Sequence, residues 1–547
     1  MSDFELLTVS SLEKIIPSNR PILLESENVC FSNEVVAFQI AYCHHTQDLI
    51  LQRCAFFVEG DLKDYITVHP VLLSPCTTPQ SAINDEWYIV KTASLIPDIL
   101  SNDEYFSVRY EQWHSLWITV KGNLPIGKHI IKVSLIDGEG GLLGKTEYTL
   151  TVLNKSLPKV AFKYAHWFHY DSLAEYYNVP VWSEEFNRIV FSFIESAVEH
   201  GVNTLFLPLI STITNTKVGL TRTMVQLVDV KKVKDKYYFN FDRVKKFMKT
   251  AESLGIEFFE ITHLFTQWGA KSSIEVFVEE DGILIKYFGW NVDALDDSYI
   301  TFIKELLSSF IKFLQEEGYG PDKCFFHISD EPNANTLSHY LKIRNHIKPI
   351  LGDYKIIDAL SNYDYYSTGA VDLPVVSTDC VKPFIENKVN ELWAYYCCGQ
   401  GGQGLSNRFM SMPSWRTRVF GIQLYAVGCK GFLHWGYNYY NTALSEEYIN
   451  PYQITDAGGS FQSGDSFIVY PSKDGKPLDS IRHEVLFEGF QDYSALMLLE
   501  EKIGREQVLT LLKKHGYEQN FIDYPKSAES LITLRKEIYK KIISLNK

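Results

Sequence analysis

The sequence is short of positive charge, of long apolar runs and of patterned cysteines, and each shortage excludes a class of protein. Its 52 lysine and arginine residues are outnumbered by 67 aspartate and glutamate residues, which gives a formal net charge of −15 at pH 7. Nucleic acids and anionic membranes bind basic surfaces, so we expect neither as a partner. No apolar run approaches the ~18 residues that a membrane-spanning helix needs. Residues 1–17 also lack the charged and apolar segments of a secretion signal, which predicts a cytoplasmic protein.

Cysteine spacing and the common catalytic motifs give no sign of a metal or a cofactor. The nine cysteines are scattered, only Cys397 and Cys398 are adjacent, and no spacing matches a zinc or haem site. We expect free thiols in a reducing compartment. The sequence contains neither the G-x-S-x-G turn of serine hydrolases nor the H-E-x-x-H helix of zinc proteases. The glycine-rich stretch 399–404 lacks the lysine and serine of a phosphate-binding loop, so we expect a flexible loop there.

The chain is too long for one ordinary core, and its patterns divide it into three regions. Residues 1–155 contain short β-rich runs separated by glycine and proline, which predicts an N-terminal β-sandwich. Residues 156–480 alternate strand-like and helix-like patterns. Residues 481–547 are predicted to be mainly helical and to pack on the middle region. The clearest strand-like runs of the first region are Val35–Ala41, Trp113–Val120, His129–Leu135 and Tyr148–Leu153.

The middle region has the pattern of an α/β protein with a (β/α)8 barrel. Apolar runs alternate with amphipathic helical patterns, such as Ser183–His200, whose apolar residues recur every three to four positions. Eight strands that alternate with helices over roughly 300 residues are the count of such a barrel. Two further β-rich pairs, within Val225–Phe239 and Ile274–Tyr287, predict inserted hairpins. The eight runs are Val160–Tyr164, Thr204–Pro208, Ile256–Thr262, Phe325–Ile328, Ile356–Leu360, Leu373–Val376, Leu392–Cys397 and Gly431–Trp435.

Two adjacent carboxylates, Asp330 and Glu331, follow the fourth run, and Pro332 prevents that strand from continuing. Within a strand, consecutive side chains point to opposite faces, but at a strand end both can turn toward one cavity. An isolated Asp-Glu-Pro is more often a solvated pair that caps the next helix. The active site of a barrel lies at the C-terminal ends of its strands, however, and this favours a catalytic role for the pair.

Polar and aromatic residues follow five other strands in the same way. Aromatic rings, amides and one carboxylate pair describe a pocket for a neutral sugar better than a site for phosphate or metal. A metal site built from His166, His169, His263 and Asp171 is the less favoured alternative, because no carboxylate–histidine spacing supports it. The five clusters are residues 166–171, 262–269, 361–366, 399–409 and 436–440.

The same residues carry a resemblance to a known family. The sequence resembles glycoside hydrolase family 123, the β-N-acetylgalactosaminidases, which combine an N-terminal β-sandwich with a (β/α)8 catalytic barrel. The resemblance extends from about residue 100 to about residue 500 and so covers both domains. The matching strings are WFHYDSLAEYYNVPVW, THLFTQWGA, FHISDEP, DALSNYDYY, LWAYYCCGQ, NRFM, GFLHWGYNYYN, GDSFIVYPSKDG and SIRHEVLFEGFQDY.

The resemblance implies that the carboxylate pair is catalytic, with Glu331 as the acid and base and Asp330 as the group that orients the substrate's 2-acetamido group. The chemistry of the residues agrees. An ordinary retaining glycosidase places its two carboxyl groups about 5–5.5 Å apart on opposite sides of the bond, and an inverting enzyme needs more room. Consecutive residues straddle a bond poorly. They can serve one edge of a sugar whose own acetamido oxygen is the nucleophile.

The other site residues are predicted from the strand ends. Tyr396 is a candidate donor to the acetamido oxygen, although Tyr395 is adjacent, and Trp435 is a candidate floor for the sugar. The expected reaction releases terminal β-GalNAc from small oligosaccharides with retention and without a metal or cofactor. The alternatives are a hexosaminidase for β-GlcNAc or another 2-acetamido sugar, and a non-catalytic glycan-binding protein. Candidates for hydroxyl contacts or for structural support are His169, Asp171, Asn407, Arg408, Tyr437 and Asn438.

Overall fold

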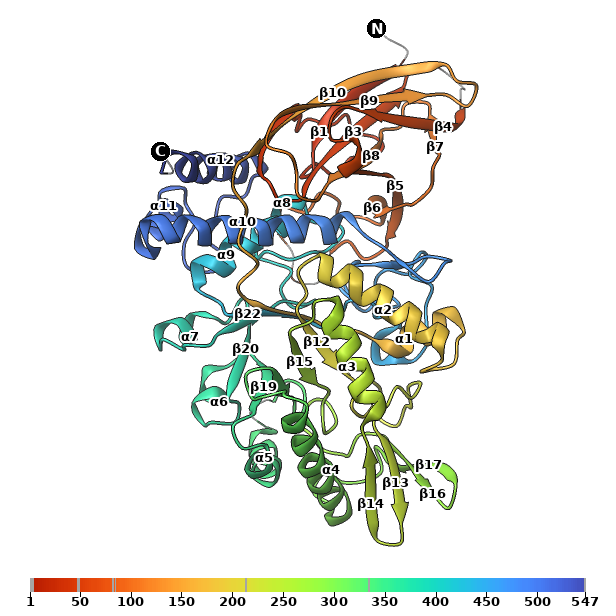
Figure 1. Cartoon of the computed structure of the whole chain (residues 1–547), viewed down its shortest axis with the longest axis vertical. Helices are drawn as coiled ribbons and strands as arrows, with labels where there is room; N and C mark the ends of the chain where they lie inside the picture. The colour runs from red at the N-terminus through yellow and green to blue at the C-terminus, as the bar shows by residue number, and fades with distance from the viewer. Residues whose placement is uncertain are drawn as a thin grey trace.

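The computed structural model describes residues 4–46, 50–80, 83, 85–211, 214–332 and 335–545, and it contains a sheet-rich N-terminal part and a barrel (Figure 1). The N-terminal part contains two five-stranded sheets, with strand orders β1-β3-β8-β5-β6 and β2-β10-β9-β4-β7. Their strands are β1 (Phe4–Ser10), β2 (Glu27–Phe31), β3 (Val36–His44), β4 (Ile50–Glu59), β5 (Ile66–Cys76), β6 (Ser94–Leu100), β7 (Phe106–Arg109), β8 (His114–Val120), β9 (Gly127–Ile136) and β10 (Leu142–Leu153).

One hydrophobic cluster joins the two N-terminal sheets. Phe38 of β3 and Tyr148 of β10 belong to different sheets, yet their rings stack with centroids 3.8 Å apart. Along β9, the buried residues Ile131, Val133 and Leu135 alternate with more exposed neighbours, which is the pattern of a strand with one face on a core. The four strand-like runs predicted for this region coincide with β3, β8, β9 and β10.

The second part is a closed barrel of eight parallel strands, as the sequence predicted. The first strand pairs with both the second and the eighth, which closes the barrel. Each of the eight predicted apolar runs overlaps one barrel strand. In order around the barrel the strands are β11 (Lys163–His166), β12 (Thr204–Leu207), β15 (Phe258–Ile261), β18 (Cys324–Phe326), β19 (Lys355–Leu360), β20 (Leu373–Ser377), β21 (Trp393–Tyr395) and β22 (Gly431–His434).

Helices connect the barrel strands and cover their outer faces. Helix α2 shows how the sequence specifies its ends: the Ser183 side chain accepts a hydrogen bond from the amide of Phe186, and Gly201 follows the helix with a φ of 91°. The described helices of this part are α1 (Tyr170–Tyr177), α2 (Glu184–Glu199), α3 (Asp242–Leu254), α4 (Asp297–Glu316), α5 (Leu337–Leu351), α6 (Tyr363–Ser367), α7 (Lys382–Glu386), α8 (Ser414–Arg418) and α9 (Phe420–Val427).

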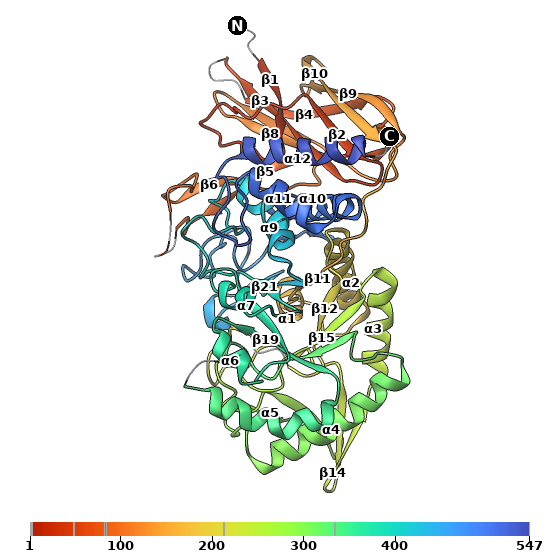
Figure 2. The ribbon, with the colours of Figure 1, turned by 90° about the vertical axis from the view of Figure 1, so that its left-hand side faces the viewer.

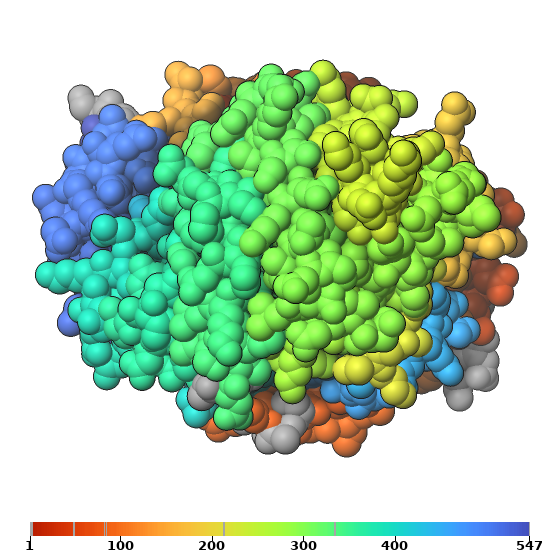
Figure 3. Space-filling model, turned by 90° about the horizontal axis from the view of Figure 1, so that it is seen from below, coloured from red at the N-terminus to blue at the C-terminus, as the bar shows by residue number. Residues whose placement is uncertain are grey.

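The two predicted hairpins form one additional sheet at the far end of the barrel part (Figure 1). Strands β13 (Asp229–Val233) and β14 (Lys236–Asn240) make the first hairpin, and β16 (Val276–Glu280) and β17 (Ile283–Phe288) make the second. The second hairpin turns at Asp281 and Gly282, which both have positive φ, as a tight hairpin turn requires. Viewed from this end (Figure 3), the surface is formed mainly by barrel segments that include α4 and α5.

The last helices lie between the N-terminal sheets and the barrel (Figures 1 and 2). They are α10 (Ile481–Ile503), α11 (Arg505–Lys514) and α12 (Ala528–Ser544). Helix α10 follows the eighth strand and packs so closely on α9 that a Cβ atom on Gly421 would lie 1.8 Å from the carbonyl oxygen of Gly489. No helix in the described part of the chain is long and apolar enough to cross a membrane.

Buried ion pairs fix the N-terminal sheets to the rest of the chain. Arg482 of α10 makes two hydrogen bonds to the carboxylate of Asp98 on β6, at 2.8 and 2.9 Å. Arg535 of α12 pairs with Glu34. Each guanidinium is buried or nearly so, and removal of the carboxylate from such a pair leaves an uncompensated charge that costs about 3–5 kcal/mol.

Candidate active site

After the fourth strand the chain makes a strained turn, and this turn carries the two adjacent carboxylates. Glu331 has a φ of 46°, in the left-handed region that side chains other than glycine rarely adopt. This turn gives consecutive side chains different surroundings. Asp330 is half-buried, whereas Glu331 is exposed. Because the strand has ended, the two carboxyl groups are no longer forced to opposite faces of a sheet.

A tyrosine from the seventh strand holds the exposed carboxylate. The hydroxyl of Tyr395 donates a hydrogen bond of 2.9 Å to Oε1 of Glu331. Tyr395 is only 7% exposed and belongs to the cluster of side chains that fills the barrel interior. Burial, and then the charge of Glu331, raise the pKa of Tyr395 well above its usual value, so this phenol remains a donor.

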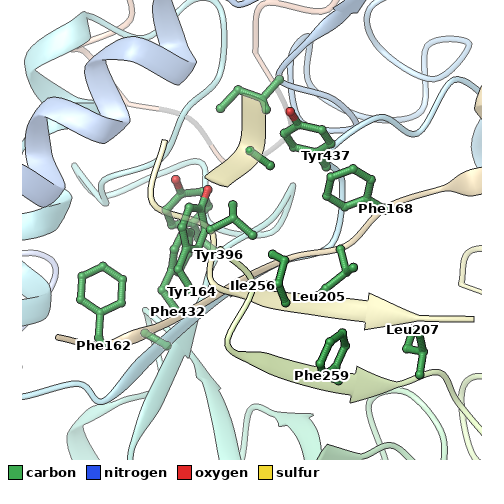
Figure 4. Close-up of a cluster of buried hydrophobic side chains, with 14 of the residues drawn as sticks. Phe162, Tyr164, Phe168, Leu205, Leu207, Ile256, Phe259, Tyr396, Phe432 and Tyr437 are labelled. Carbon is green, nitrogen blue, oxygen red and sulfur yellow. The ribbon is translucent and has the colours of Figure 1, made fainter. Parts of the chain in front are cut away.

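Tyr396, the tyrosine predicted as a donor to the substrate's acetamido oxygen, does not lie beside this carboxylate. Successive side chains of a strand alternate between faces, so Tyr396 points out of the barrel when Tyr395 points in. Its ring packs against Phe420, Phe432 and His434, in the buried cluster between the strands and the outer helices (Figure 4). The structure therefore corrects this assignment by one residue: Tyr395 is the tyrosine at the carboxylate pair.

The loop after the third strand runs alongside the segment that carries the carboxylate pair. The amides of Leu264 and Phe265 donate to the carbonyl oxygens of His327 and Ile328, at 3.2 and 2.9 Å. The amide of Trp268 donates to the carbonyl oxygen of Asp330 at 3.1 Å. These bonds extend the pairing of the third and fourth strands beyond their ends and fix the backbone of the carboxylate pair.

Trp435 lies at the end of the eighth strand and is partly exposed, as a sugar platform must be. Its indole Nε1 donates to Oδ2 of Asp465 at 3.2 Å, and its ring meets those of Tyr439 and Phe461 edge-on. Burial raises the pKa of Asp465 to about 7. Asp465 was not among the predicted site residues. The one indication of it in the sequence was its place in the family-like string GDSFIVYPSKDG.

Arg408 and Asn407, which were predicted as candidates for sugar contacts or for support, have supporting roles in the structure. Arg408 is fully buried and donates to ring nitrogens of His166 and His434, at 2.7 and 2.9 Å. Asn407 is also fully buried and donates to the carbonyl oxygens of Cys397 and Gln400. Their polar atoms face protein groups, so neither side chain is available to a sugar in this arrangement.

His169 and Asp171, two of the predicted site residues, both contact Arg222. Arg222 and Asp171 form a buried ion pair that the sequence did not reveal. Arg222, from the segment between β12 and β13, binds both carboxylate oxygens of Asp171 at 2.7 and 2.8 Å and contacts Nδ1 of His169 at 3.2 Å. Burial, and then the charge of Arg222, lower the pKa of His169 to about 3. This histidine is therefore neutral and holds the loop rather than acting as an acid.

Tyr437 and Asn438 also face protein groups. The Tyr437 hydroxyl donates to the carbonyl oxygen of Phe193 on α2 at 3.2 Å, and its ring lies in the outer buried cluster (Figure 4). The side-chain amide of Asn438 accepts a hydrogen bond from the backbone N–H of His169 and donates one to the carbonyl oxygen of His169. Of the eight predicted substrate contacts, Trp435 is the one that the structure leaves partly exposed.

The histidines considered as metal ligands do not converge. His166 contacts Arg408 and Tyr164, whereas His263 packs against His327 with ring centroids 4.9 Å apart. Within the described ranges, the two groups with ligand atoms close enough for one ion are Cys43, His45 and Glu111, and His200, Asp479 and His483. Neither group includes a residue of the metal site that was considered as the less favoured alternative.

A third carboxyl group lies near the pair and is fully buried. Asp358 of the fifth strand accepts a hydrogen bond of 2.9 Å from the Tyr340 hydroxyl, and its burial, followed by the charge of Asp330, raises its pKa well above the usual range. Burial and the charge of Glu331 raise the pKa of Asp330 as well. The site thus holds carboxyl groups in surroundings that resist their ionisation.

The glycine-rich loop 399–404 is held at both ends, contrary to the expectation of a free loop. Asp85, from the segment between β5 and β6, accepts a bond from the amide of Gly404 at 2.7 Å and binds Arg416 through both carboxylate oxygens at 2.6 and 2.9 Å. The hydroxyl of Tyr88 donates to the carbonyl oxygen of Gly401 at 2.6 Å. The N-terminal part thereby fixes a loop that begins four residues after Tyr395.

A closed parallel barrel with carboxylates and aromatic residues at its strand ends is a glycoside hydrolase architecture, and the comparisons agree with this class. Residues 167–499 match the family model described as "Glycoside hydrolase 123, catalytic domain". This match spans more than half of the chain, and the protein belongs to glycoside hydrolase family 123. No curated protein matches the sequence.

A solved structure shows the same fold. The chain is similar to a family 123 glycoside hydrolase from Clostridium perfringens, in a study of glycolipid glycan hydrolysis, with a TM-score of 0.75 and 14% identity over 99% of this chain and 98% of that chain. A GH5 xyloglucanase from Bacteroides ovatus gives a TM-score of 0.32, with 8% identity over 85% of this chain and 98% of that chain. That second likeness is too low to carry an argument.

The raised pKa of Asp330 predicts a pH-dependent gain of stability in Asp330→Asn. Between the ordinary pKa of about 3.9 and its raised value, Asp330 binds more protons in the folded protein than in the unfolded chain, so stability falls as pH rises through this window. The variant cannot ionise. We expect its melting temperature to match the wild type near pH 4 and to exceed it by on the order of 2 °C above pH 8.

Asp353→Asn is the matched control for this measurement, because Asp353 is exposed and follows α5 outside the site. Thermal unfolding across the pH range should show no pH-dependent gain in the control. A constant difference between Asp330→Asn and the wild type at every pH would contradict the assignment of a raised pKa to Asp330.

Proposed function

We propose that the protein is a retaining exo-β-N-acetylgalactosaminidase that uses the acetamido group of its substrate as the nucleophile. The observation that carries this proposal is the strained turn at Glu331, which gives two consecutive carboxyl groups different surroundings on one side of the site. An enzyme that supplied its own nucleophile would need the second carboxyl group across the bond from the acid. The substrate we propose is a small oligosaccharide with a terminal β-GalNAc.

In the first step, the acetamido carbonyl oxygen attacks the anomeric carbon as the bond from that carbon to the leaving oxygen breaks. Glu331 gives its proton to the leaving oxygen, and a cyclic oxazolinium ion forms within the sugar. In the second step, water attacks the anomeric carbon, its proton passes to Glu331, and the ring opens to restore the acetamide. Two inversions at the same carbon give net retention.

Asp330 is proposed to accept a hydrogen bond from the acetamido N–H and to stabilise the positive charge that develops there. Burial makes ionisation of this carboxyl unfavourable in the free enzyme, as its raised pKa shows. The developing charge on the amide favours the ionised form. The interaction is therefore stronger in the transition state than in the free protein, which is the condition for catalysis.

Tyr395 takes the place that we expected for Tyr396. Its hydroxyl donates to Glu331 in the free site. We propose that this bond orients the acid and that the same hydroxyl donates to the acetamido oxygen when substrate binds. Trp435 is proposed as the floor of the sugar site, with Asp465 fixing its ring. For the two N-terminal sheets we propose a β-sandwich that acts as a scaffold, since its segment at Asp85 and Tyr88 holds the loop after Tyr395.

Substrate choice is tested with aryl β-glycosides that differ only in the sugar. We expect turnover of the GalNAc compound, weaker turnover of the GlcNAc compound and none of the galactoside, which lacks the acetamido nucleophile. Product release is measured by absorbance, and the anomer formed first is identified by NMR. Comparable rates with the galactoside would contradict the proposed function, and a faster GlcNAc compound would assign the protein to the alternative hexosaminidase activity.

Glu331→Gln tests the acid and base. The change keeps the shape of the side chain but removes the proton donor, so kcat/KM on natural glycosides should fall by about 10²–10⁴-fold. Leaving groups that need little protonation should lose less in the first step. The measurement is a series of aryl leaving groups with different pKa values, with Glu386→Gln, an exposed glutamate of α7, as the control. Equal losses across the series would exclude Glu331 as the acid.

Fluorination of the acetyl group tests whether the substrate supplies the nucleophile. Mono-, di- and trifluoroacetyl analogues withdraw electrons from the carbonyl oxygen with little change of size, so the rate of the chemical step should fall with each fluorine. Asp330→Asn should slow the same step, because it removes the charge that stabilises the amide. A rate independent of fluorination, or a covalent sugar ester detected by mass spectrometry, would show that a protein carboxylate attacks instead.

A further inference from the structure

Trp268 is the most exposed tryptophan of the chain. Its side chain is 43% exposed, and the other nine tryptophans are buried or only partly exposed. Its indole makes no hydrogen bond or ring contact with another described residue. A single exposed apolar side chain is common on a protein surface, so exposure alone assigns no role to Trp268. Its place beside the carboxylate pair makes the ring a candidate for contact with a ligand.

The backbone that carries this ring is strained. Trp268, Gly269 and Ala270 all have positive φ, at 55°, 115° and 53°. Two of these residues have side chains, and such conformations persist only where the surroundings impose them. The amide of Ala270 donates to the carbonyl oxygen of Thr266 at 3.0 Å. A Cβ atom on Gly269 would lie 2.4 Å from the side chain of Thr336, so a glycine is required there.

The strained turn lies directly beside the catalytic segment. The amide of Trp268 bonds to the carbonyl oxygen of Asp330, the residue before the proposed acid Glu331. Glu331 is an exposed residue whose Oε1 is bonded to Tyr395, so in the proposed reaction the leaving group that it protonates lies on the solvent side of the pair. Trp435 is held within the strand-end cluster by Asp465 and suits the sugar that is cleaved off. Trp268 comes from a different loop and is more exposed.

We infer that Trp268 is the platform of a second sugar site, which stacks on the apolar C–H face of the pyranose ring on the leaving-group side of the bond. This inference rests on the proposed function and adds the residue that recognises the sugar ring on the leaving-group side, a contact that a small alcohol could not make. An indole presents a wide planar face with few rotatable bonds, which suits a ring ligand of this kind.

Two substrates with the same β-GalNAc and different leaving groups test the inference. One is a disaccharide in which GalNAc is linked to a hexose, and the other is the methyl β-glycoside, whose leaving group has no ring. Both leave as alkoxides that need protonation, so both depend on Glu331. We expect Trp268→Ala to lower kcat/KM for the disaccharide about tenfold and to leave the methyl glycoside within about twofold.

Trp268→Phe keeps a planar ring and should retain most of the activity on the disaccharide. Tyr238→Ala, at an exposed aromatic residue of the hairpin strand β14, is the matched control and should change neither rate. Equal losses of Trp268→Ala on both substrates would overturn the inference and show that the residue acts through the backbone of Asp330. An unchanged rate on the disaccharide would overturn it too. Failure of the proposed function is distinct, because the wild type would then cleave neither substrate.

Discussion

The site depends on one backbone constraint, the left-handed conformation of Glu331. Two carboxyl groups on consecutive residues repel each other and, inside a strand, would be separated by the sheet. The turn, in which Glu331 has a φ of 46°, places the two side chains in different surroundings. Asp330 is half-buried, and Glu331 is at the surface, where its carboxylate accepts a hydrogen bond from Tyr395. The conformation is unfavourable for a glutamate, so neighbouring structure must impose it.

That support comes from both sides of the fourth strand. The loop after the third strand bonds to the carbonyl oxygens of His327, Ile328 and Asp330, and the fifth strand places the buried Asp358 nearby. Parallel pairing of β15 with β18 and of β18 with β19 makes these strands neighbours. The carboxyl groups of Asp330 and Asp358 are thus held in surroundings that penalise their charge, a penalty that the remainder of the fold has to offset.

The sequence was sufficient for the barrel, because apolar runs separated by glycine and proline repeat along the chain, and Asp-Glu-Pro follows a barrel strand as predicted. The catalytic role of the pair stays a prediction. The sequence did not predict which face of a strand a side chain occupies, or which residues far apart in the chain contact each other. Tyr395 is the last residue of β21 and Tyr396 follows it, so their side chains point to opposite faces, and no local pattern in the sequence shows which of the two points into the barrel. Arg222, Asp465 and Asp85 reach the site from loops far away in the sequence. The residues that they contact could be singled out from the sequence, but the sequence did not show which residues pair.

The bond from Asp85 to Arg416 has a consequence for how this enzyme can be divided. Arg416 is fully buried, and the carboxylate that neutralises it belongs to the N-terminal part. The same holds for Arg482, which relies on Asp98. A fragment that starts at the first barrel strand would carry two interior guanidinium groups without counter-charges. The barrel therefore cannot be moved into another protein without the N-terminal part. In engineering and in evolution, the two parts have to change together.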